Sequence, residues 1–234
     1  MTAQDILNEL RPLGRESYKK VLLNHGIKEP CYGVKIEDMK KIQKRIKKDY
    51  RLALELYDTG VYDAMYLAGM IADDALMTRK DLQKWVSQAL GCLVGYMVPW
   101  VATGSPVGHE LALEWIESKH EHIAAAGWAT FSSLMSVKKD TELDLAELKK
   151  LLTRVERTIH QAPNEVRYAM NSFVIAAGCF VKALTATALK IGEKLGPINV
   201  DMGNTSCKVP YAPDYIRKVQ ARGTIGKKRK SAKC

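Results

Sequence analysis

Residues 32–74 read YGVKIEDMKKIQKRIKKDYRLALELYDTGVYDAMYLAGMIADD, and this stretch decides the fold. Between residues 35 and 51 it holds eight Lys or Arg residues against three acids. Met39, Ile42 and Ile46 recur at the spacing of one helix face, and the basic residues take the other sides. The stretch therefore predicts paired amphipathic helices, one of which packs on a core with one face and presents cations on the other.

Helix-period stripes continue outside this stretch at intervals of roughly 15 to 20 residues, whereas the alternating pattern of β-strands is nearly absent. In successive pairs the second helix is the more apolar. This predicts an all-α protein, an α-solenoid in which antiparallel helix pairs stack on one another. An irregular helical bundle is the alternative. In the first third of the chain, helices are expected at about 3–24 with a break near Pro12, and at 36–48, 50–58 and 61–74. Further along, one helix is expected to begin at Thr78, a segment that follows it is expected to bend or end at Pro99, and another helix is expected to end near Glu117. The remaining helices are expected at 121–135, at 145–159, after Asn164 and at 214–222.

Three regions follow from this pattern. Residues 1–196 form the predicted helical-repeat domain, and residues 197–225 are expected to add a loop and a short helix packed on it. Residues 226–234 read GKKRKSAKC, a segment too polar to fold alone, and are predicted to be a disordered basic tail.

The positive charge is concentrated in two places. The net charge is +10, of which residues 35–51 contribute +5 (eight basic, three acidic) and residues 208–234 contribute +8 (nine basic, one acidic), so the other 190 residues carry −3. Localised Lys and Arg are expected for a polyanionic partner such as nucleic acid, because their contacts release counterions from phosphates. The alternative is that a lysine-rich helix face only keeps the protein in solution.

The sequence predicts an intracellular protein. The start of the chain lacks the basic segment and apolar run of a secretory signal, and no apolar window is long enough to span a membrane, so no membrane partner is expected. We expect a cytoplasmic location, associated with the nucleoid. Five widely separated cysteines are expected to be reduced thiols: Cys31, Cys92, Cys179, Cys207 and Cys234.

The segments YGVKIEDMKKI (32–42), ALELY (53–57) and YDAMYLAGMIAD (62–73) resemble the DNA alkylation repair family, the HEAT-like-repeat alkylpurine DNA glycosylases of the AlkD type. The resemblance implies a solenoid of HEAT-like helix pairs with a basic concave face that holds duplex DNA. It also implies hydrolysis of the N-glycosidic bond of cationic alkylpurines, 3-methyladenine and 7-methylguanine. A carboxylate beside the sugar would stabilise the developing oxocarbenium ion.

The residues that the family uses for this chemistry are not recognisable. A Trp-x-x-x-Asp element is expected within residues 82–109, which contain no Asp or Glu, and an Arg is expected within residues 123–128, which contain none. We therefore predict a protein that binds DNA and has lost or altered the glycosylase chemistry, and we assign no catalytic residue, cofactor or metal. The alternatives are a glycosylase that recruits Asp63, Asp73 or Asp74, and a HEAT-like scaffold for an acidic protein partner.

The expected interface uses cations and aromatic groups. We predict duplex DNA as the partner of a monomer. The predicted phosphate contacts are Lys40, Lys41, Lys44, Arg45, Lys47, Lys48, Arg167, Lys208, Lys227, Lys228, Arg229 and Lys230. The pocket candidates for a base or a phosphate are Tyr96, Trp100, Trp128, Asn171 and Phe173, although large aromatic residues are also common core fillers.

Overall fold

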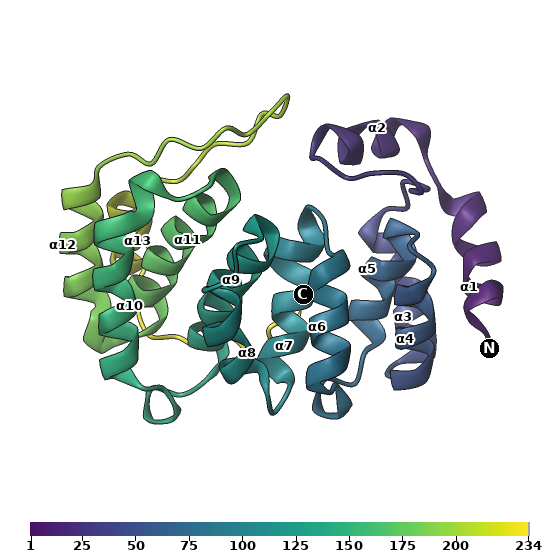
Figure 1. Cartoon of the computed structure of the whole chain (residues 1–234), viewed down its shortest axis with the longest axis horizontal. Coiled ribbons are helices and arrows are strands. Elements are labelled where there is room, and N and C mark those ends of the chain that lie inside the picture. The colour runs from purple at the N-terminus through teal and green to yellow at the C-terminus, as the bar shows by residue number, and fades with distance from the viewer. Residues whose placement is uncertain (234) are drawn as a thin grey trace. The chain divides into compact units, whose positions relative to one another are not determined.

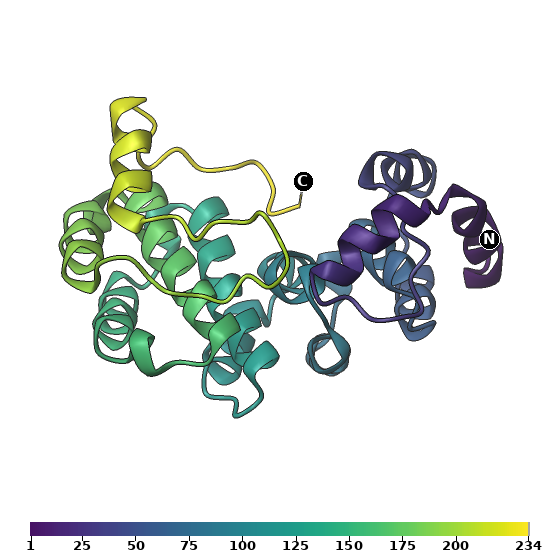
Figure 2. The same ribbon diagram turned by 90° about the horizontal axis from the view of Figure 1, so that it is seen from above.

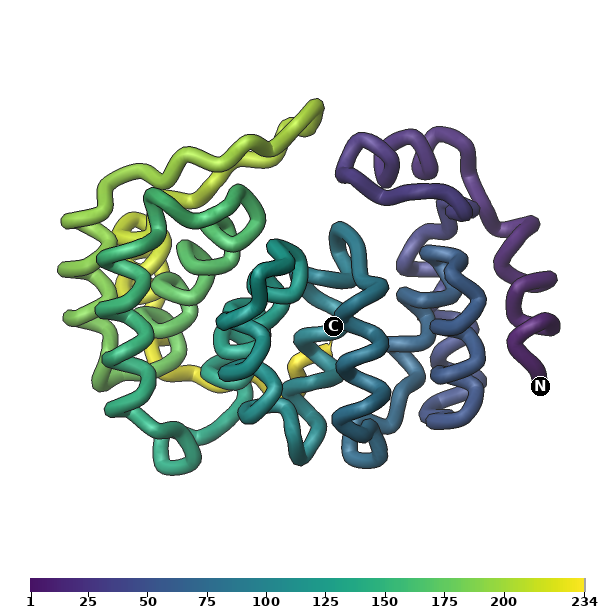
Figure 3. The backbone as a smooth tube through the Cα atoms, in the orientation of Figure 1, coloured from purple at the N-terminus to yellow at the C-terminus, as the bar shows by residue number. Residues whose placement is uncertain are grey.

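The computed structural model describes residues 1–233, and every regular element in that range is a helix or helical turn. Figures 1 and 3 show the path of the chain as successive helices, with a long loop between α12 (Thr185–Leu195) and α13 (Ala212–Ala221). Contacts divide the chain into two compact units. Unit 1 comprises residues 1–107, 202–206 and 233, and unit 2 comprises residues 108–201 and 207–232.

Unit 1 contains the stretch that decides the fold. The break predicted near Pro12 is a 3-10 turn between two short helices. The helices of unit 1 are α1 (Ala3–Leu10), α2 (Glu16–Asn24), α3 (Ile36–Ile46), α4 (Tyr50–Asp58), α5 (Tyr62–Ile71), α6 (Arg79–Gln88) and α7 (Val98–Gly104), with short turns η1 (Arg11–Leu13) and η2 (Asp74–Leu76) and a π-helical turn η3 (Leu93–Met97).

Helix boundaries in unit 1 follow from side chains that cap the chain ends. The Thr78 hydroxyl accepts from the Asp81 backbone N–H, and the Asp81 carboxylate accepts from the Thr78 N–H, so a reciprocal pair of hydrogen bonds begins α6. Asp49 accepts from the Leu52 N–H and begins α4. These caps are local in sequence, which explains why the predicted starts near residues 50 and 78 are confirmed.

The core of unit 1 is built around α5, whose residues are buried almost throughout. It packs on α3 and α4. The Tyr57 ring of α4 stacks on Trp85 of α6 with centroids 4.2 Å apart, and its hydroxyl donates to the Trp85 carbonyl at 2.7 Å. Gly69 lets α5 approach the π-helical turn, because a Cβ there would lie 2.1 Å from the Met97 sulfur. The predicted pairing of an amphipathic helix with a more apolar partner is confirmed in this unit.

One buried carboxylate joins α5 to the segment before α3. Asp63 has no exposed surface, and it accepts from the backbone N–H of Tyr32 at 2.6 Å and of Val34 at 2.7 Å. Both N–H groups lie in residues 31–35, which form no helix. Asp63 therefore satisfies backbone donors that no secondary structure would satisfy.

Unit 2 is built around α11, which packs on α9, α12 and α13. Trp128 and Phe131 of α9 meet Phe173 of α11 edge to face, with centroids 5.1 and 6.2 Å apart, and all three rings are buried. Figure 2 shows α13 lying across α11 and α12. The elements are α8 (Gly108–Trp115), α9 (Glu121–Val137), α10 (Leu145–Thr158), α11 (Asn164–Phe180), α12 (Thr185–Leu195) and α13 (Ala212–Ala221), with 3-10 turns η4 (Asp140–Glu142), η5 (Ile159–Gln161) and η6 (Lys182–Leu184).

The segment predicted to be a disordered tail differs in the structure, because residues 226–233 make specific contacts. The Gly226 N–H donates to the Cys179 carbonyl at 2.8 Å, the Arg229 N–H donates to the Ser136 carbonyl at 2.8 Å, and Ala232 is buried. Composition alone predicted disorder because it does not reveal hydrogen-bond partners that are distant in sequence. Cys234 lies outside the described residues.

Two further findings concern the described chain. None of its helices alone is long and apolar enough to cross a membrane, although α11 with residues 182–195, bent by 115°, satisfies length and composition together. Cys31, Cys92, Cys179 and Cys207 form no disulfide. Burial raises the pKa of the Cys31 thiol to about 12 and that of Cys179 to about 11, so both are unreactive thiols at neutral pH.

Candidate nucleic-acid interface

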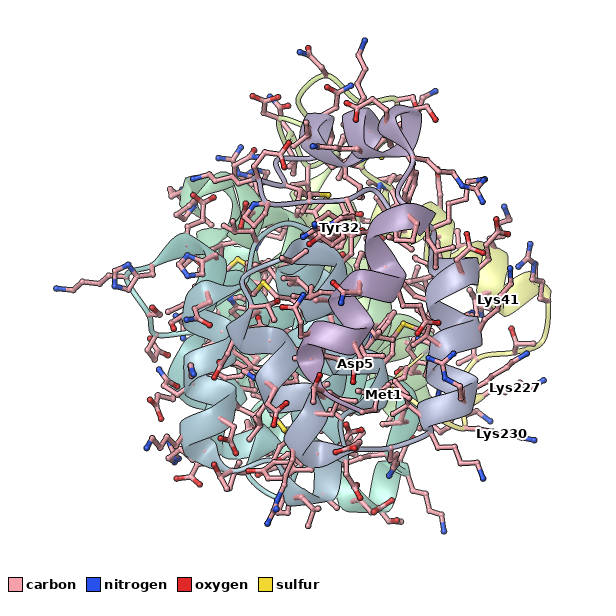
Figure 4. All side chains as sticks on the ribbon, turned by 90° about the vertical axis from the view of Figure 1, so that its right-hand side faces the viewer. Met1, Asp5, Tyr32, Lys41, Lys227 and Lys230 are labelled. Carbon is pink, nitrogen blue, oxygen red and sulfur yellow. The ribbon has the colours of Figure 1, made fainter. Side chains whose placement is uncertain are left out.

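The basic helix of the opening stretch presents a cationic surface, here called the α3 surface. Met39 and Ile42 are buried and hold the inner face of α3 against the core. Figure 4 shows the Lys41 side chain extending outward from this helix. The α3 surface consists of Lys40, Lys41, Lys44, Arg45, Lys47 and Lys48, all of them exposed.

Three of these cations are already engaged in ion pairs. Lys41 lies 2.8 Å from Asp38, Arg45 lies 2.5 Å from Glu9, and Lys48 lies 3.0 Å from Asp73. The hydrogen bond from Lys41 and the neighbouring Arg15 charge lower the pKa of Asp38. These pairs compensate the three charges, but exposed ion pairs contribute little stability, so other anions can replace the acidic partners.

The other three cations, Lys40, Lys44 and Lys47, make no ion pair within residues 1–233. They come from neighbouring turns of a single helix and its end. Three uncompensated ammonium groups on a rigid element raise the local positive potential, which favours binding of a polyanion.

Lys47 occupies a backbone position that lysine disfavours. It ends α3 with φ 65° and ψ −104°, a conformation that glycine adopts far more easily, and its N–H donates to the Gln43 carbonyl at 2.7 Å. Strained backbone positions often lie at functional sites.

We predict that Lys47→Gly separates stability from binding. Relief of backbone strain is expected to raise the free energy of unfolding by about 1 kcal/mol, because glycine adopts positive φ without a Cβ penalty. Loss of the ammonium group is expected to weaken DNA binding. Urea unfolding and fluorescence anisotropy on one duplex measure the two effects. Lys47→Ala is the control, since it removes the charge and keeps the strain. Equal stability of the glycine and alanine variants would contradict the prediction.

Two of the predicted pocket residues reach the surface of unit 1. Tyr96 lies in the π-helical turn and is 47% exposed, and Trp100 of α7 is half-buried. Their ring centroids are 5.7 Å apart at an interplanar angle of 51°. π-Helical turns are often functional sites. The pair therefore offers aromatic surface that can contact a sugar or an unstacked base.

The other three pocket predictions are corrected by the structure. Trp128 and Phe173 are fully buried and pack against each other as core, so they line no pocket. Asn171 is buried, and its side-chain amide donates to the Pro210 carbonyl at 2.9 Å. A helix stripe shows which side chains share a face, but it does not distinguish the side that packs from the side that faces a groove. That ambiguity explains the error.

Arg167 also has a structural role in unit 2. Its guanidinium donates to the Asn199 carbonyl at 2.7 Å and to the Ala162 carbonyl at 3.0 Å. Asn164 and Asp201 add reciprocal hydrogen bonds of 2.8 Å between the same helix and loop. Arg167 therefore holds the loop after α12 against α11.

The described part of the basic C-terminal segment separates into anchored and outward-facing residues. Lys228 is only 18% exposed, and its ammonium group lies 2.8 Å from both the Met135 carbonyl and Asp140. Figure 4 shows Lys227 and Lys230 extending outward, and both are exposed. Lys208 and Arg229 are exposed as well. Lys228, one of the predicted phosphate contacts, is therefore bound by groups of the protein itself.

The three carboxylates of the alternative glycosylase hypothesis are engaged in other contacts. Asp63 accepts two backbone hydrogen bonds, and Asp73 pairs with Lys48. Asp74 lies against Gly104, where a Cβ would be 2.6 Å from its carboxylate, and it pairs with Lys233 at 2.5 Å. Residues 1–233 also contain no group of three or more His, Cys, Asp or Glu side chains placed to hold a metal ion.

The family model described as DNA alkylation repair enzyme matches residues 6–216 of this sequence. The chain belongs to the DNA alkylation repair enzyme family. The match covers both contact units, and it confirms the resemblance carried by the opening stretch.

Known relatives agree with this assignment. A solved structure of a new family of proteins related to the HEAT-like repeat DNA glycosylases, with affinity for branched DNA structures, is 34% identical with a TM-score of 0.92, and each chain is covered completely. Uncharacterized proteins of Listeria innocua and Listeria monocytogenes are each 29% identical over 95% of this chain and 99% of their own. The predicted all-α fold of HEAT-like helix pairs is confirmed.

Sequence reasoning missed the two lysine–aspartate contacts of the C-terminal segment, Lys228 with Asp140 and Lys233 with Asp74. The available signal was a pair of aspartates placed shortly after buried helices, each able to pair with a lysine of the basic segment. That signal is weak because Asp is common in such turns.

Proposed function

We propose that this DNA alkylation repair family protein binds DNA through the α3 surface and releases no base. The observation that carries the proposal is the set of three exposed ammonium groups, Lys40, Lys44 and Lys47, which make no ion pair within the described chain. Their helix is fixed by the buried side chains of Met39 and Ile42, so the charges are presented without a large ordering cost. In a cell such binding would place the protein on the nucleoid.

We further propose that branched DNA is bound more tightly than a linear duplex. The solved relative of 34% identity has affinity for branched DNA structures. Branch points expose bases at the ends of stacked arms, and the Tyr96–Trp100 pair offers aromatic surface of the kind that contacts such bases. Phosphate contacts alone would not distinguish the two substrates, because every duplex offers the same charges.

Loss of base release is supported by the state of the carboxylates. Residues 82–109, where the family resemblance places an aspartate, hold none, and Gly104 stands four residues after Trp100. The nearby Asp74 is neutralised by Lys233. A carboxylate bound to an ammonium group is a poor stabiliser of a developing oxocarbenium ion.

Two assays on the same preparation test the proposal. Fluorescence anisotropy should show binding to a four-way junction and to a duplex of the same total length, with the junction preferred and both affinities falling steeply as salt rises. Incubation with methylated DNA should release 3-methyladenine and 7-methylguanine no faster than a buffer blank. Salt-independent binding would overturn the DNA-binding part. Release above the blank would overturn the non-catalytic part and support the glycosylase alternative.

A further inference from the structure

The end of α9 in unit 2 holds a lysine ammonium group between a main-chain carbonyl and a carboxylate. Lys228 Nζ lies 2.8 Å from the Met135 carbonyl, within the last turn of α9, and 2.8 Å from Asp140 Oδ1. Asp140 is the first residue of the 3-10 turn η4. The neighbouring Arg229 N–H donates to the Ser136 carbonyl at 2.8 Å. Carbonyls at a helix end have no partner within the helix, so both contacts satisfy otherwise unpaired groups.

The end of α5 in unit 1 is built in the same way. Lys233 Nζ lies 2.9 Å from the Ala72 carbonyl, immediately after α5, and 2.5 Å from Asp74 Oδ1. Asp74 is the first residue of the 3-10 turn η2. The side chains of Asp74 and Lys233 are 21% and 18% exposed, so water reaches the pair only slightly.

The two sites share their components and the position of the aspartate, but the carbonyl belongs to Ala72, two residues before Asp74, in one and to Met135, five residues before Asp140, in the other. Each follows a buried helix, and each aspartate stands three residues after the last helical residue, Ile71 or Val137. In both, the ammonium group donates to one main-chain carbonyl and lies at ion-pair distance from one carboxylate, at the negative end of a helix dipole. The aspartate therefore recurs at the same point after two buried helices.

We propose that the end of α5 with Asp74 and the end of α9 with Asp140 are binding sites for a primary ammonium group, and that Lys233 and Lys228 of the C-terminal segment are their resident ligands. The chemistry fits the ligand class. A primary ammonium group has three donors and a compact charge, so it serves a carbonyl and a carboxylate at once. A guanidinium group would not fit as well, because its donors spread in a plane.

The inference extends the role of the C-terminal segment beyond DNA binding. In unit 2, Lys228 and the Arg229 N–H hold the segment to the end of α9, and the exposed Lys227 and Lys230 are carried on this held backbone. Fixed cations lose less conformational entropy on binding a phosphate than cations on a free tail. The ammonium sites themselves do not depend on DNA and can be tested without it.

Trypsin supplies the first test, because it cleaves after Lys and Arg and residues 227–230 offer four consecutive sites. In the full chain these bonds are expected to be protected relative to a free peptide of residues 223–233. Asp140→Asn removes the charge that holds Lys228, and cleavage at residues 227–230 should accelerate by about tenfold or more. Asp214→Asn, at an exposed acid of α13, is the matched control and should leave the rate unchanged. Equal rates for the full chain and the peptide would overturn the proposal.

Chemical rescue supplies the second test. It remains informative if a variant is less stable, because it measures the recovery of stability by an added ligand. Lys233→Ala should lower the melting temperature, and propylammonium chloride, which replaces the missing atoms, should restore part of the loss. Tetramethylammonium chloride at the same concentration is the control, because it donates no hydrogen bond. The double variant Asp74→Asn/Lys233→Ala should show no propylammonium effect. An equal effect of both salts, or rescue of the double variant, would overturn the proposal.

Discussion

Asp63→Ala is expected to lower the free energy of unfolding by about 3–5 kcal/mol. Asp63 has no exposed surface, and its two carboxylate oxygens accept from the N–H groups of Tyr32 and Val34 at 2.6 and 2.7 Å. Alanine leaves both donors buried without a partner, and each unpaired donor costs roughly 1–3 kcal/mol. The substitution also leaves an empty volume beside α5.

Urea unfolding followed by circular dichroism measures this effect. Asp58→Ala on the neighbouring helix is the control, since Asp58 is half exposed and forms an ion pair with the surface residue Lys84. That variant should change the free energy of unfolding by less than about 1 kcal/mol. If Asp63→Ala is no more destabilising than Asp58→Ala, the hydrogen bonds from the Tyr32 and Val34 N–H groups to Asp63 do not contribute the expected free energy of unfolding.

Charge reversal of the α3 surface is expected to abolish most of the DNA affinity. Lys40, Lys44 and Lys47 lie on the exposed side of α3 and pair with no acid in the described chain, so Glu at these positions removes attraction and adds repulsion. We expect binding to weaken by roughly a hundredfold or more at low salt, and the slope of log K against log salt to fall by about 2.7 if all three contact phosphates.

The control is a triple variant with the same change in charge at lysines of unit 2. Lys119, Lys149 and Lys150 are exposed lysines of unit 2, and Lys149 and Lys150 lie on α10. Their triple substitution by Glu alters the net charge equally but should reduce affinity much less. Equal losses in the two triple variants would show that net charge, and not the α3 surface, governs binding.

The helices could be predicted from the sequence because their signals are local. Met39, Ile42 and Ile46 mark the inner face of α3, and the Thr78–Asp81 pair marks the start of α6. Each signal needs only residues within one or two helical turns. The positions of the helices and the alternation of amphipathic and apolar members therefore followed from periodicity and capping.

The pocket could not be predicted because its residues depend on contacts between distant segments. Trp128 and Phe173 carry the same aromatic signal as Trp100, but they pack against each other, whereas Trp100 meets the exposed ring of Tyr96. No local pattern distinguishes these two environments.

The role of the basic residues was also only partly predictable. Charge density correctly singled out α3 as an exposed cationic helix, but it gave the same weight to Lys228, which a contact 93 residues away in sequence holds to α9. Composition reports how much charge a segment carries, and only the fold reports which charges are already satisfied.

Lysine footprinting tests the central claim most directly. The protein is acetylated with a water-soluble reagent, free and saturated with a four-way junction, and mass spectrometry measures the modification rate of each lysine. We predict that DNA slows acetylation of Lys40, Lys44 and Lys47, while Lys149 and Lys150 react at the same rate in both states. Unchanged rates at Lys40, Lys44 and Lys47 in the saturated complex would contradict the claim that the α3 surface holds the DNA.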